Sequence, residues 1–541
     1  MKQVARKKVA ASIGRGSDTI HASNHISDGA GSYLDHLTTE LVEVSIADVV
    51  DSSIDSSGPV DDFIYLDIGS VDRERKTFVE RKLIPLAEAP SRARQKVQAG
   101  DVLVSMTRPN LNAVAQVTQE LHGSIASTGF HVLRSPWIET GFLYYLVQTD
   151  DFVDAMCGVV QGALYPAVRP RDIEGFKFYL PPRAEQTRIV EKLQELLSDL
   201  DAGVAELKAA QRKLAQYRQS LLKAAVEGTL TADWRVARAS SNESQESGAD
   251  LLQRILTERR TRWETRHLAN FAEQGKPPPK GWQAKYPEPV AADTTDLPEL
   301  PKGWVWASLD ALIKEGPQNG LYLPSSLYGR GIPILRIDDY QIGWYRERDA
   351  LSRVQADASI SDAYELKSGD IVINRVNSMT HLGKCLEVPA SLDAALFESN
   401  MMRMRLHGSV STSYVAFYLG SVAGRARLTK DAKWAVNQAS INQQDVRRTP
   451  VPLPSFEEQI AIVEQLDLHH EAIDAQLAAV DGSLQQSAAQ RKNILKAAFA
   501  GQLVPQDPDD EPASVLLERI RAAKVEHAGK AKPVAKRGRK A

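Results

Sequence analysis

The chain has 541 residues, enough for about three or four domains of ordinary size, and its hydrophobic content of 43% and charged content of 25% are those of a soluble globular protein. It contains no apolar run of the length that crosses a bilayer and only two cysteines, one in each half, so we expect a cytoplasmic protein with no membrane partner and no disulfide framework. The formal net charge of −3 argues against a nonspecific polycation, although local basic patches could still bind DNA.

The first part of the chain divides into an extension and a mixed α/β module. Residues 1–40 are rich in Ser, Gly and His and show no periodicity, which predicts a loose extension. Residues 41–182 contain short apolar alternations, such as residues 63–66, that predict strands. Two prolines end the module at positions 181 and 182, where proline is tolerated just ahead of a helix.

Residues 183–228 predict one long helix. A leucine recurs at every seventh position, which is the period of a coiled-coil stripe. About 40 residues of helix span roughly 60 Å. The residues of this stripe are Leu193, Leu200, Leu207, Leu214 and Leu221.

Residues 229–300 form a connector between two similar halves. A charged helix is predicted around Leu251 and Ile255. Lys276 and the three prolines that follow it begin a stiff, extended linker that contains further prolines up to Pro301.

The second half has the same plan as the first. Residues 301–455 predict a second α/β module, and residues 456–501 predict a second long helix whose stripe keeps the same register. Two apolar stripes of equal length in one chain indicate that each helix buries the other. The residues of the second stripe are Leu466, Ile473, Val480 and Ile494.

The last segment, residues 502–541, predicts a short helix and a basic tail. From Arg519 to Lys540 there are nine basic residues against the single acid Glu526. The Ala, Gly and Lys content of this tail is typical of a disordered, solubilising segment.

Short motifs that flank the first long helix return on both sides of the second with one fixed offset, which is 273 positions from Leu180 to Leu453. The number of residues between the motifs is the same in both copies, although the sequence between them is only loosely repeated. This indicates that the length of the helix is important. The repeated motifs are Leu-Pro-Pro at 180–182 with Glu185 and Gln186, which returns as Leu-Pro-Ser at 453–455 with Glu458 and Gln459, and Lys-Ala-Ala at 223–225 with Gly228, which returns at 496–498 with Gly501.

The two modules also repeat each other, but their polar loops differ. A Gly-Asp turn into a strand at residues 100–104 corresponds to residues 369–373. The loops that follow these strands carry different sets of Arg, Asn, Gln and Tyr. One frame with two sets of polar side chains is what recognition of two different targets requires.

This order of module and helix, with Leu-Pro-Pro and Glu-Gln before each helix and Lys-Ala-Ala after it, resembles the specificity subunit of type I restriction-modification enzymes. The second copy departs from the motif at Ser455. The resemblance covers about residues 41–522, so the extension and the basic tail lie outside it. It implies a mixed α/β fold class with two target recognition domains, separated by two long antiparallel coiled-coil helices in a pseudo-twofold internal repeat.

The resemblance also implies the partners and the role of the chain. Each target recognition domain would recognise one half of an asymmetric, interrupted site in double-stranded DNA, and the helices would set the spacing and dock two methyltransferase subunits. Restriction or translocase subunits would complete the complex. This chain would bind no cofactor itself, whereas S-adenosylmethionine, ATP and magnesium are expected on the partner subunits.

Candidate DNA contacts follow from the chemistry of base edges. Arginine fits guanine, and asparagine or glutamine fits adenine, while phosphate contacts fix the register. In the first module the candidates are Thr107, Arg108, Asn110, Asn112, Gln161, Tyr165 and Arg169, and in the second they are Asn374, Arg375, Asn377, Ser378, Trp434, Asn437 and Gln438.

The sequence carries no catalytic signature that we can identify. It has no Walker phosphate loop, no glycine-rich nucleotide fingerprint, no Asn-Pro-Pro-aromatic motif of adenine methyltransferases and no cysteine pattern for a metal. We therefore predict a non-catalytic subunit. Two alternatives are a specificity subunit of another restriction or methyltransferase-only system, and a coiled-coil scaffold that carries two adaptor domains and binds no DNA. Salt-dependent binding of the assembled complex to duplex DNA would exclude the scaffold.

Overall fold

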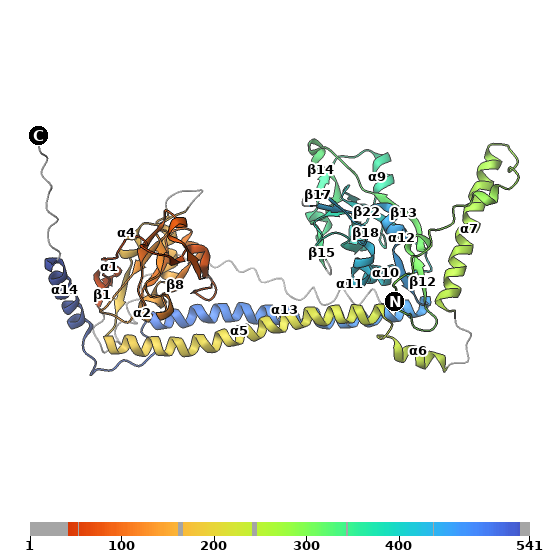
Figure 1. Cartoon of the computed structure of the whole chain (residues 1–541). Coiled ribbons are helices and arrows are strands. Elements are labelled where there is room, and N and C mark those ends of the chain that lie inside the picture. The colour runs from red at the N-terminus through yellow and green to blue at the C-terminus, as the bar shows by residue number, and fades with distance from the viewer. Residues whose placement is uncertain are drawn as a thin grey trace, which may run out of the picture. The chain divides into compact units, whose positions relative to one another are not determined.

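The computed structural model describes residues 42–51, 53–79, 81–160, 166–240, 246–341, 344–435 and 438–530. These residues form two compact units, and each unit contains one α/β module and part of each long helix (Figure 1). The first unit joins residues up to 205 with residues from 484 onward, and the second comprises residues 206–483. The predicted fold class, two mixed α/β modules with two long packed helices, is confirmed.

The described part of the first module contains two sheets of three and four strands, two two-stranded pairs and four short α-helices. One sheet has the strand order β5-β2-β9-β6 and the other β10-β7-β8, while β1 pairs with β11 and β3 with β4. The strands are β1 (Val42–Ser45), β2 (Phe63–Leu66), β3 (Val71–Asp72), β4 (Thr77–Phe78), β5 (Lys82–Ile84), β6 (Ala93–Lys96), β7 (Val102–Ser105), β8 (Val114–Gln116), β9 (Ile125–Ser127), β10 (Phe130–Leu133) and β11 (Lys177–Leu180). The helices are α1 (Ile46–Val49), α2 (Thr140–Leu146), α3 (Asp150–Gly158) and α4 (Pro170–Glu174).

The second module repeats this plan and adds a further three-stranded sheet. Its main sheet has the order β13-β22-β18-β20, and two three-stranded sheets have the orders β17-β14-β21 and β19-β24-β23. The strands are β12 (Val305–Ser308), β13 (Ile313–Asn319), β14 (Tyr328–Leu335), β15 (Tyr340–Gln341), β16 (Trp344–Tyr345), β17 (Ser352–Val354), β18 (Ile371–Asn374), β19 (Val376–Asn377), β20 (Cys385–Glu387), β21 (Leu396–Phe397), β22 (Met401–Leu406), β23 (Lys433–Ala435), β24 (Gln438–Ser440) and β25 (Pro450–Leu453). The helices are α8 (Leu309–Leu312), α9 (Ala358–Tyr364), α10 (Thr412–Gly420), α11 (Val422–Leu428) and α12 (Gln443–Arg448).

Each module has a central strand that is buried on both faces. In β7, Val102 and Val104 pack into one hydrophobic cluster and Leu103 packs into another. In β18, Ile371 and Ile373 occupy one cluster while Val372 occupies a second. Because alternate side chains of a strand point to opposite faces, both strands are continuous apolar runs rather than alternations.

The long helices α5 (Arg183–Val226) and α13 (Phe456–Phe499) have 44 residues each, or about 66 Å of helix. They pack antiparallel (Figure 1). Three polar pairs show how the two helices are aligned. From one pair to the next, the residue number rises by ten and then by seven along α5 and falls by the same amounts along α13. The pairs are Asp201 with Arg491, Gln211 with Asp481 and Arg218 with Asp474.

The glycines of the repeated motif end both helices. Gly228 and Gly501 have φ values of 71° and 70°, in the left-handed region that favours glycine. This conformation turns the chain back so that later backbone N–H groups reach the last helical carbonyls, as between Leu230 and Ala224. The fixed spacing of the Lys-Ala-Ala and glycine motif therefore reflects a helix C-cap.

The predicted coiled-coil residues differ in how deeply they are buried. Leu193, Leu221, Leu466 and Ile473 are buried. Leu200, Leu207, Leu214, Val480 and Ile494 are half-buried. In this pair of helices, the stripes gain full burial where a module also covers them, because a two-helix contact alone shields only one side.

Replacing Ile473 with aspartate should lower the free energy of unfolding by about 2–4 kcal/mol, because a carboxylate would enter an apolar seam without a partner. The same change at half-buried Leu200 should cost less. Denaturant unfolding of the purified chain would measure both variants. Aspartate at Ala475, an exposed position on the same helix, is the control, and an equal loss at all three positions would contradict the packing of this seam.

The remaining helices are α6 (Ala232–Ala239), α7 (Gly248–Glu273) and α14 (Ala513–Lys530). The predicted disorder of the tail is wrong for residues 519–530, which belong to α14. Alanine, lysine, arginine and glutamate favour helix, and Leu516, Leu517 and Ile520 are buried in the first unit. Residues 1–40 and the end of the basic tail lie outside the described residues.

Candidate nucleic-acid interface

In the first module, two of the predicted loops are joined by backbone hydrogen bonds. The loop that follows β7 meets the segment that precedes α4, because the N–H of Arg108 donates to the carbonyl of Pro166 (2.8 Å) and the N–H of Val168 donates to that of Met106 (2.9 Å). Thr107 also pairs with Ala167 in an isolated bridge. Residues about 60 positions apart thus form one surface, which we call the first recognition surface (residues 106–112 and 166–169).

The backbone of this surface is held in an uncommon conformation. Arg108 and Asn112 flank a 3₁₀ turn and have left-handed φ values of 50° and 40°. Few non-glycine residues adopt this region, so the surrounding contacts must maintain it. One such contact is the ammonium group of Lys76, which donates to the carbonyl of Asn112 (2.5 Å). Burial lowers the pKa of Lys76 to about 8, with a further contribution from the positive charge of Arg491.

The candidate side chains of the first module lie at the solvent side of these loops. Thr107, Arg108, Asn110 and Arg169 are exposed, and Asn112 is half-buried. Arg169 is the N-cap residue just before α4, and its backbone N–H donates to the Asp172 carboxylate (2.8 Å). The two other candidates of this module, Gln161 and Tyr165, lie outside the described residues.

In the second module, the small sheet β19-β24-β23 brings the predicted loops together. Asn377 and Trp434 both lie opposite Ala439 of the middle strand. The N–H of Ile441 donates to the carbonyl of Arg375 (2.9 Å), which is the counterpart of the bond between Val168 and Met106. We call residues 375–378, 433–435 and 438–441 the second recognition surface.

The candidates of the second module are not equally accessible. Trp434 is 71% exposed and Gln438 is also exposed. Arg375, Asn377 and Ser378 are half-buried; a guanidinium N–H of Arg375 donates to the carbonyl of Ser399 (3.2 Å), and the amide oxygen of Asn377 accepts from the N–H of Ser378 (2.8 Å). Asn437 lies outside the described residues.

Asn374 does not reach the surface of the second module. Its side chain is fully buried, and its amide oxygen accepts a hydrogen bond from the hydroxyl of Tyr340 (2.5 Å). Burial raises the pKa of Tyr340 well above its usual value, so this hydroxyl stays a donor. Asn374 therefore supports the end of β18, and we leave it out of the proposed DNA contacts.

Two further residues belong near these surfaces and were not among the candidates. Lys76 fixes the turn at Asn112 but lies in a charged turn whose sequence shows no periodic signal. Tyr322 is 86% exposed, and its neighbour Leu321 bridges to Glu398, next to the Ser399 that Arg375 contacts. An aromatic residue flanked by Gly320 and Pro324 in a loop was the available signal for it.

The Glu-Gln motif ties each long helix to its module. The amide oxygen of Gln186 accepts from the N–H of Glu139, at the start of α2 (2.9 Å), and its amide nitrogen donates to the carbonyl of Pro181 (2.9 Å). Gln459 repeats both bonds, with the N–H of Ser411 (2.8 Å) and the carbonyl of Pro454 (3.1 Å). Both glutamines are fully buried, so each module is fixed to the first turn of its helix.

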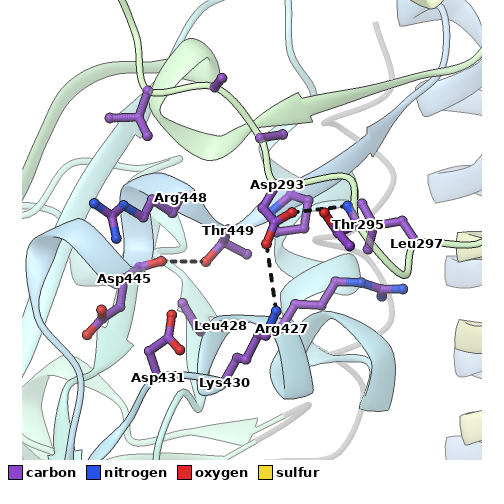
Figure 2. Close-up of a pocket in the computed structure, with 14 residues that line it drawn as sticks. Asp293, Thr295, Leu297, Arg427, Leu428, Lys430, Asp431, Asp445, Arg448 and Thr449 are labelled. Atoms are coloured by element: carbon purple, nitrogen blue, oxygen red, sulfur yellow. Dashed lines mark hydrogen bonds and ion pairs between the residues drawn. The ribbon is translucent and has the colours of Figure 1, made fainter.

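One cavity of the second unit lies beside the connector. It has a volume of about 340 Å³ and lies between connector residues 290–297 and helices α11 and α12 (Figure 2). Its polar groups contact one another: Asp293 lies 3.7 Å from Lys430 and accepts from the N–H of Thr295 (3.0 Å), and Thr449 donates to the carbonyl of Asp445 (2.9 Å). We interpret this cavity as the seam along which the connector packs.

Two absences concern the described residues. In this part of the chain, no group of three or more His, Cys, Asp or Glu side chains could hold a metal ion. Nor does any helix of the described segments combine the length and the apolar character needed to span a bilayer.

Comparisons with known proteins agree with this architecture, although no family model matches the chain. The chain is 25% identical to the type I restriction enzyme EcoKI specificity subunit of Escherichia coli (strain K12) over 480 residues, which cover 85% of this chain and 88% of the relative. It is 24% identical to the StySPI specificity subunit of Salmonella potsdam over 483 residues, with the same coverage. A solved structure from a type I restriction-modification system superposes with a TM-score of 0.61 and 22% identity, covering 85% of this chain and 98% of that one.

The fold and the paired surfaces define a protein of two repeated α/β modules on an antiparallel helical hairpin. Over most of its length the chain is similar in sequence to type I restriction enzyme specificity subunits, and it shares its fold with the solved structure.

Proposed function

We propose that this chain is the non-catalytic specificity subunit of a type I restriction-modification complex, and that each module recognises one half of an asymmetric, interrupted DNA site. The observation that carries this proposal is the equivalence of the two recognition surfaces. Both are joined by the same backbone hydrogen bond, Val168 to Met106 and Ile441 to Arg375, yet they display different polar side chains. A shared frame with unlike side chains suits two unlike half-sites.

The exposed side chains have the chemistry of base recognition. Arg108 and Arg169 on the first surface can donate two hydrogen bonds to a guanine, and Gln438 on the second can pair with an adenine edge. Trp434 offers an exposed ring for apolar or stacking contact. On the first surface, the fixed backbone at Arg108 and Asn112 would hold the loop in place before DNA arrives, which reduces the entropy lost on binding.

The two long helices would set the distance between the half-sites and dock two methyltransferase subunits. In this proposal, S-adenosylmethionine, ATP and magnesium bind to the methyltransferase and restriction subunits, and this chain binds none of them. The pseudo-twofold repeat supports a pair of equivalent docking sites for two identical partners.

The test is to express the chain with the methyltransferase encoded beside it, in a host that lacks DNA methylation, and to map modified adenines across the genome. We expect one interrupted motif that disappears when this chain is omitted. Methylation that does not depend on this chain, or a stable complex that binds duplex DNA with no salt dependence, would contradict the proposal and favour a scaffold.

Replacing Arg108 with alanine should relax one base position in one half-site. The loss of a bidentate contact to guanine is worth about 1–3 kcal/mol of discrimination. Binding competition between duplexes that differ at single positions would measure it. Alanine at Arg94, an exposed arginine outside the recognition surfaces, is the control. A uniform loss of affinity for all sequences would instead assign Arg108 to a phosphate contact.

A further inference from the structure

A second cavity of the second unit is lined by positive charges. Its volume is about 200 Å³, and it lies between α7, α8 and the first residues of β13. Its polar side chains are Arg259, Arg262, Lys314, His407 and Arg447. No acidic side chain lines the cavity itself, which distinguishes it from the connector seam.

Two of the arginines are positioned by the short helix α8. Arg447 donates to the carbonyl of Gly316 (2.7 Å) and to the carboxylate of Asp310. Arg259 donates to the backbone carbonyl of Asp310. Because a guanidinium group has five N–H donors, both side chains keep donors for a ligand while their positions are fixed.

The opposite wall is held by a buried histidine. His407 lies 3.1 Å from a guanidinium nitrogen of Arg262 and 3.0 Å from the carboxylate of Glu258. Burial is the largest effect on His407 and lowers its pKa, so the ring is neutral at pH 7 and orients its neighbours without adding charge. Lys314 is exposed at the rim.

The charges around this cavity do not cancel. Arg259, Arg262, Lys314 and Arg447 are cations, whereas Asp310 and Glu258 are the carboxylates that contact the lining residues. The excess of two positive charges matches a phosphate group, which carries a charge of about −1.5 to −2 at neutral pH.

The internal repeat provides a natural comparison. In the first unit, Lys524 of α14 donates to the carbonyl of Ala47 (2.5 Å). This contact corresponds to the one in the second unit, where Arg259 of α7 donates to the carbonyl of Asp310. Counting along the matching helices α1 and α8, and α4 and α12, Lys314 corresponds to Asp51 and Arg447 corresponds to Glu174. Burial lowers the pKa of Lys524, and the negative charges of Asp48, Asp51 and Glu174 oppose this change. The same place is thus balanced by carboxylates in one unit and cationic in the other.

The cavity is remote from the second recognition surface. In the main sheet, Ile313 pairs with Leu406 at the end near the cavity, while Asn319 pairs with Met402 at the other end, where Asn374 leads into the recognition loop. The six residues of β22 separate the two ends by roughly 17 Å. The cavity and the recognition loop therefore lie at opposite ends of this sheet.

We propose that this cavity binds a phosphate dianion, either free or as the terminal phosphate of a small phosphomonoester, through Arg259, Arg262, Lys314 and Arg447. The volume suits such a group rather than a drug-sized ligand, which needs about 300–1,000 Å³. The first unit, with acids at two of the corresponding positions, should not bind it.

Calorimetric titration of the full chain with inorganic phosphate tests the proposal. We expect one saturable site per chain, and at least tenfold weaker binding when Lys314→Asp is combined with Arg447→Glu, the residue types of the first unit. The matched control is Lys285→Glu with Lys302→Asp, which makes the same change in net charge at exposed positions of the second unit. Absence of a saturable site in the parent chain, or equal weakening by the control, would overturn the proposal.

Because Arg447 also supports α8, the double variant could lose binding through misfolding, and a single variant is needed to separate the two effects. Lys314→Asp changes an exposed rim residue and should weaken phosphate binding while leaving the melting temperature without phosphate unchanged. A nucleoside monophosphate and inorganic phosphate should compete for the site. Binding of the assembled complex to duplex DNA should be unaffected by Lys314→Asp. A parallel loss of duplex binding would assign the cavity to the DNA backbone and overturn the proposal, without contradicting the proposed function.

Discussion

Replacing Glu458 with alanine should lower the free energy of unfolding by about 3–5 kcal/mol, the cost of breaking a buried charge pair. Glu458 is 4% exposed and accepts hydrogen bonds from the indole N–H of Trp304 (2.8 Å), the hydroxyl of Thr231 (2.7 Å) and the guanidinium of Arg235 (2.5 Å). Alanine would leave three donors unsatisfied, one of them charged. Denaturant unfolding would measure the loss, with exposed Glu464→Ala on the same helix as the control.

Glu185, the equivalent residue of the first unit, should make the chain more stable at pH 7 when its charge is removed. Glu185 is 1% exposed, and among the described residues no donor bonds to either of its carboxylate oxygens. Burial raises its pKa, while the charge of Arg188 partly opposes this effect. A raised pKa means that the folded state binds the proton more tightly, so stability rises as the pH falls through that pKa. Glu185→Gln should therefore raise stability at pH 7 and remove this pH dependence.

The comparison of the two glutamates separates burial from hydrogen bonding. Glu458→Gln should destabilise the chain at pH 7, because the neutral amide weakens the contact with Arg235. Unfolding of both glutamine variants at pH 5 and pH 7 measures the contrast. Equal losses in the two variants would mean that Glu185 also has a donor, and the contrast between the two units would be lost.

Inserting seven residues into each long helix should abolish methylation of the original site and create a site with the same half-sites and a longer gap. The insertions belong after Leu207 and after Leu484, where the register of the two helices matches. Seven residues add about 10 Å of helix and keep the apolar stripe in phase. At about 3.4 Å per base pair, the gap should grow by about three base pairs.

The duplex imposes a second condition on this variant. Three base pairs turn B-DNA by about 100°, whereas seven residues turn a helix by only about 20° from its original face. The variant should therefore bind its new site more weakly than the parent binds its own. Mapping of modified adenines measures both effects, and insertion into α5 alone is the control that should destroy the register. Altered half-sites, or an unchanged gap, would contradict the proposed role of the helices.

The helices and the repeat were predictable because their signals are local. A leucine period of seven and the glycines at 228 and 501 suffice to place a long helix and its end. The tail was misjudged because helicity there depends on Ile520, which packs into the core of a module more than 300 residues earlier in the sequence.

The site was harder to predict because it depends on contacts between distant segments. Asn374 looks like a loop residue in sequence, but Tyr340, 34 positions earlier, buries and bonds its side chain. Lys76 fixes the turn at Asn112 across 36 positions. The Glu-Gln motif was visible as a repeat, yet its use of Gln186 and Gln459 to fasten module to helix needed the positions of Glu139 and Ser411.

The strand pairs that close the modules make each one an exchangeable cassette. Val42 lies opposite Leu180, and Val305 lies opposite Leu453, so the chain enters and leaves each module at neighbouring points. A foreign module with the same two terminal strands, and a backbone N–H for Gln186 or Gln459 to accept from, could be grafted there without altering the helices. Recombination between related genes at these two short segments would then change one half of the target sequence in a single event and leave the other half intact.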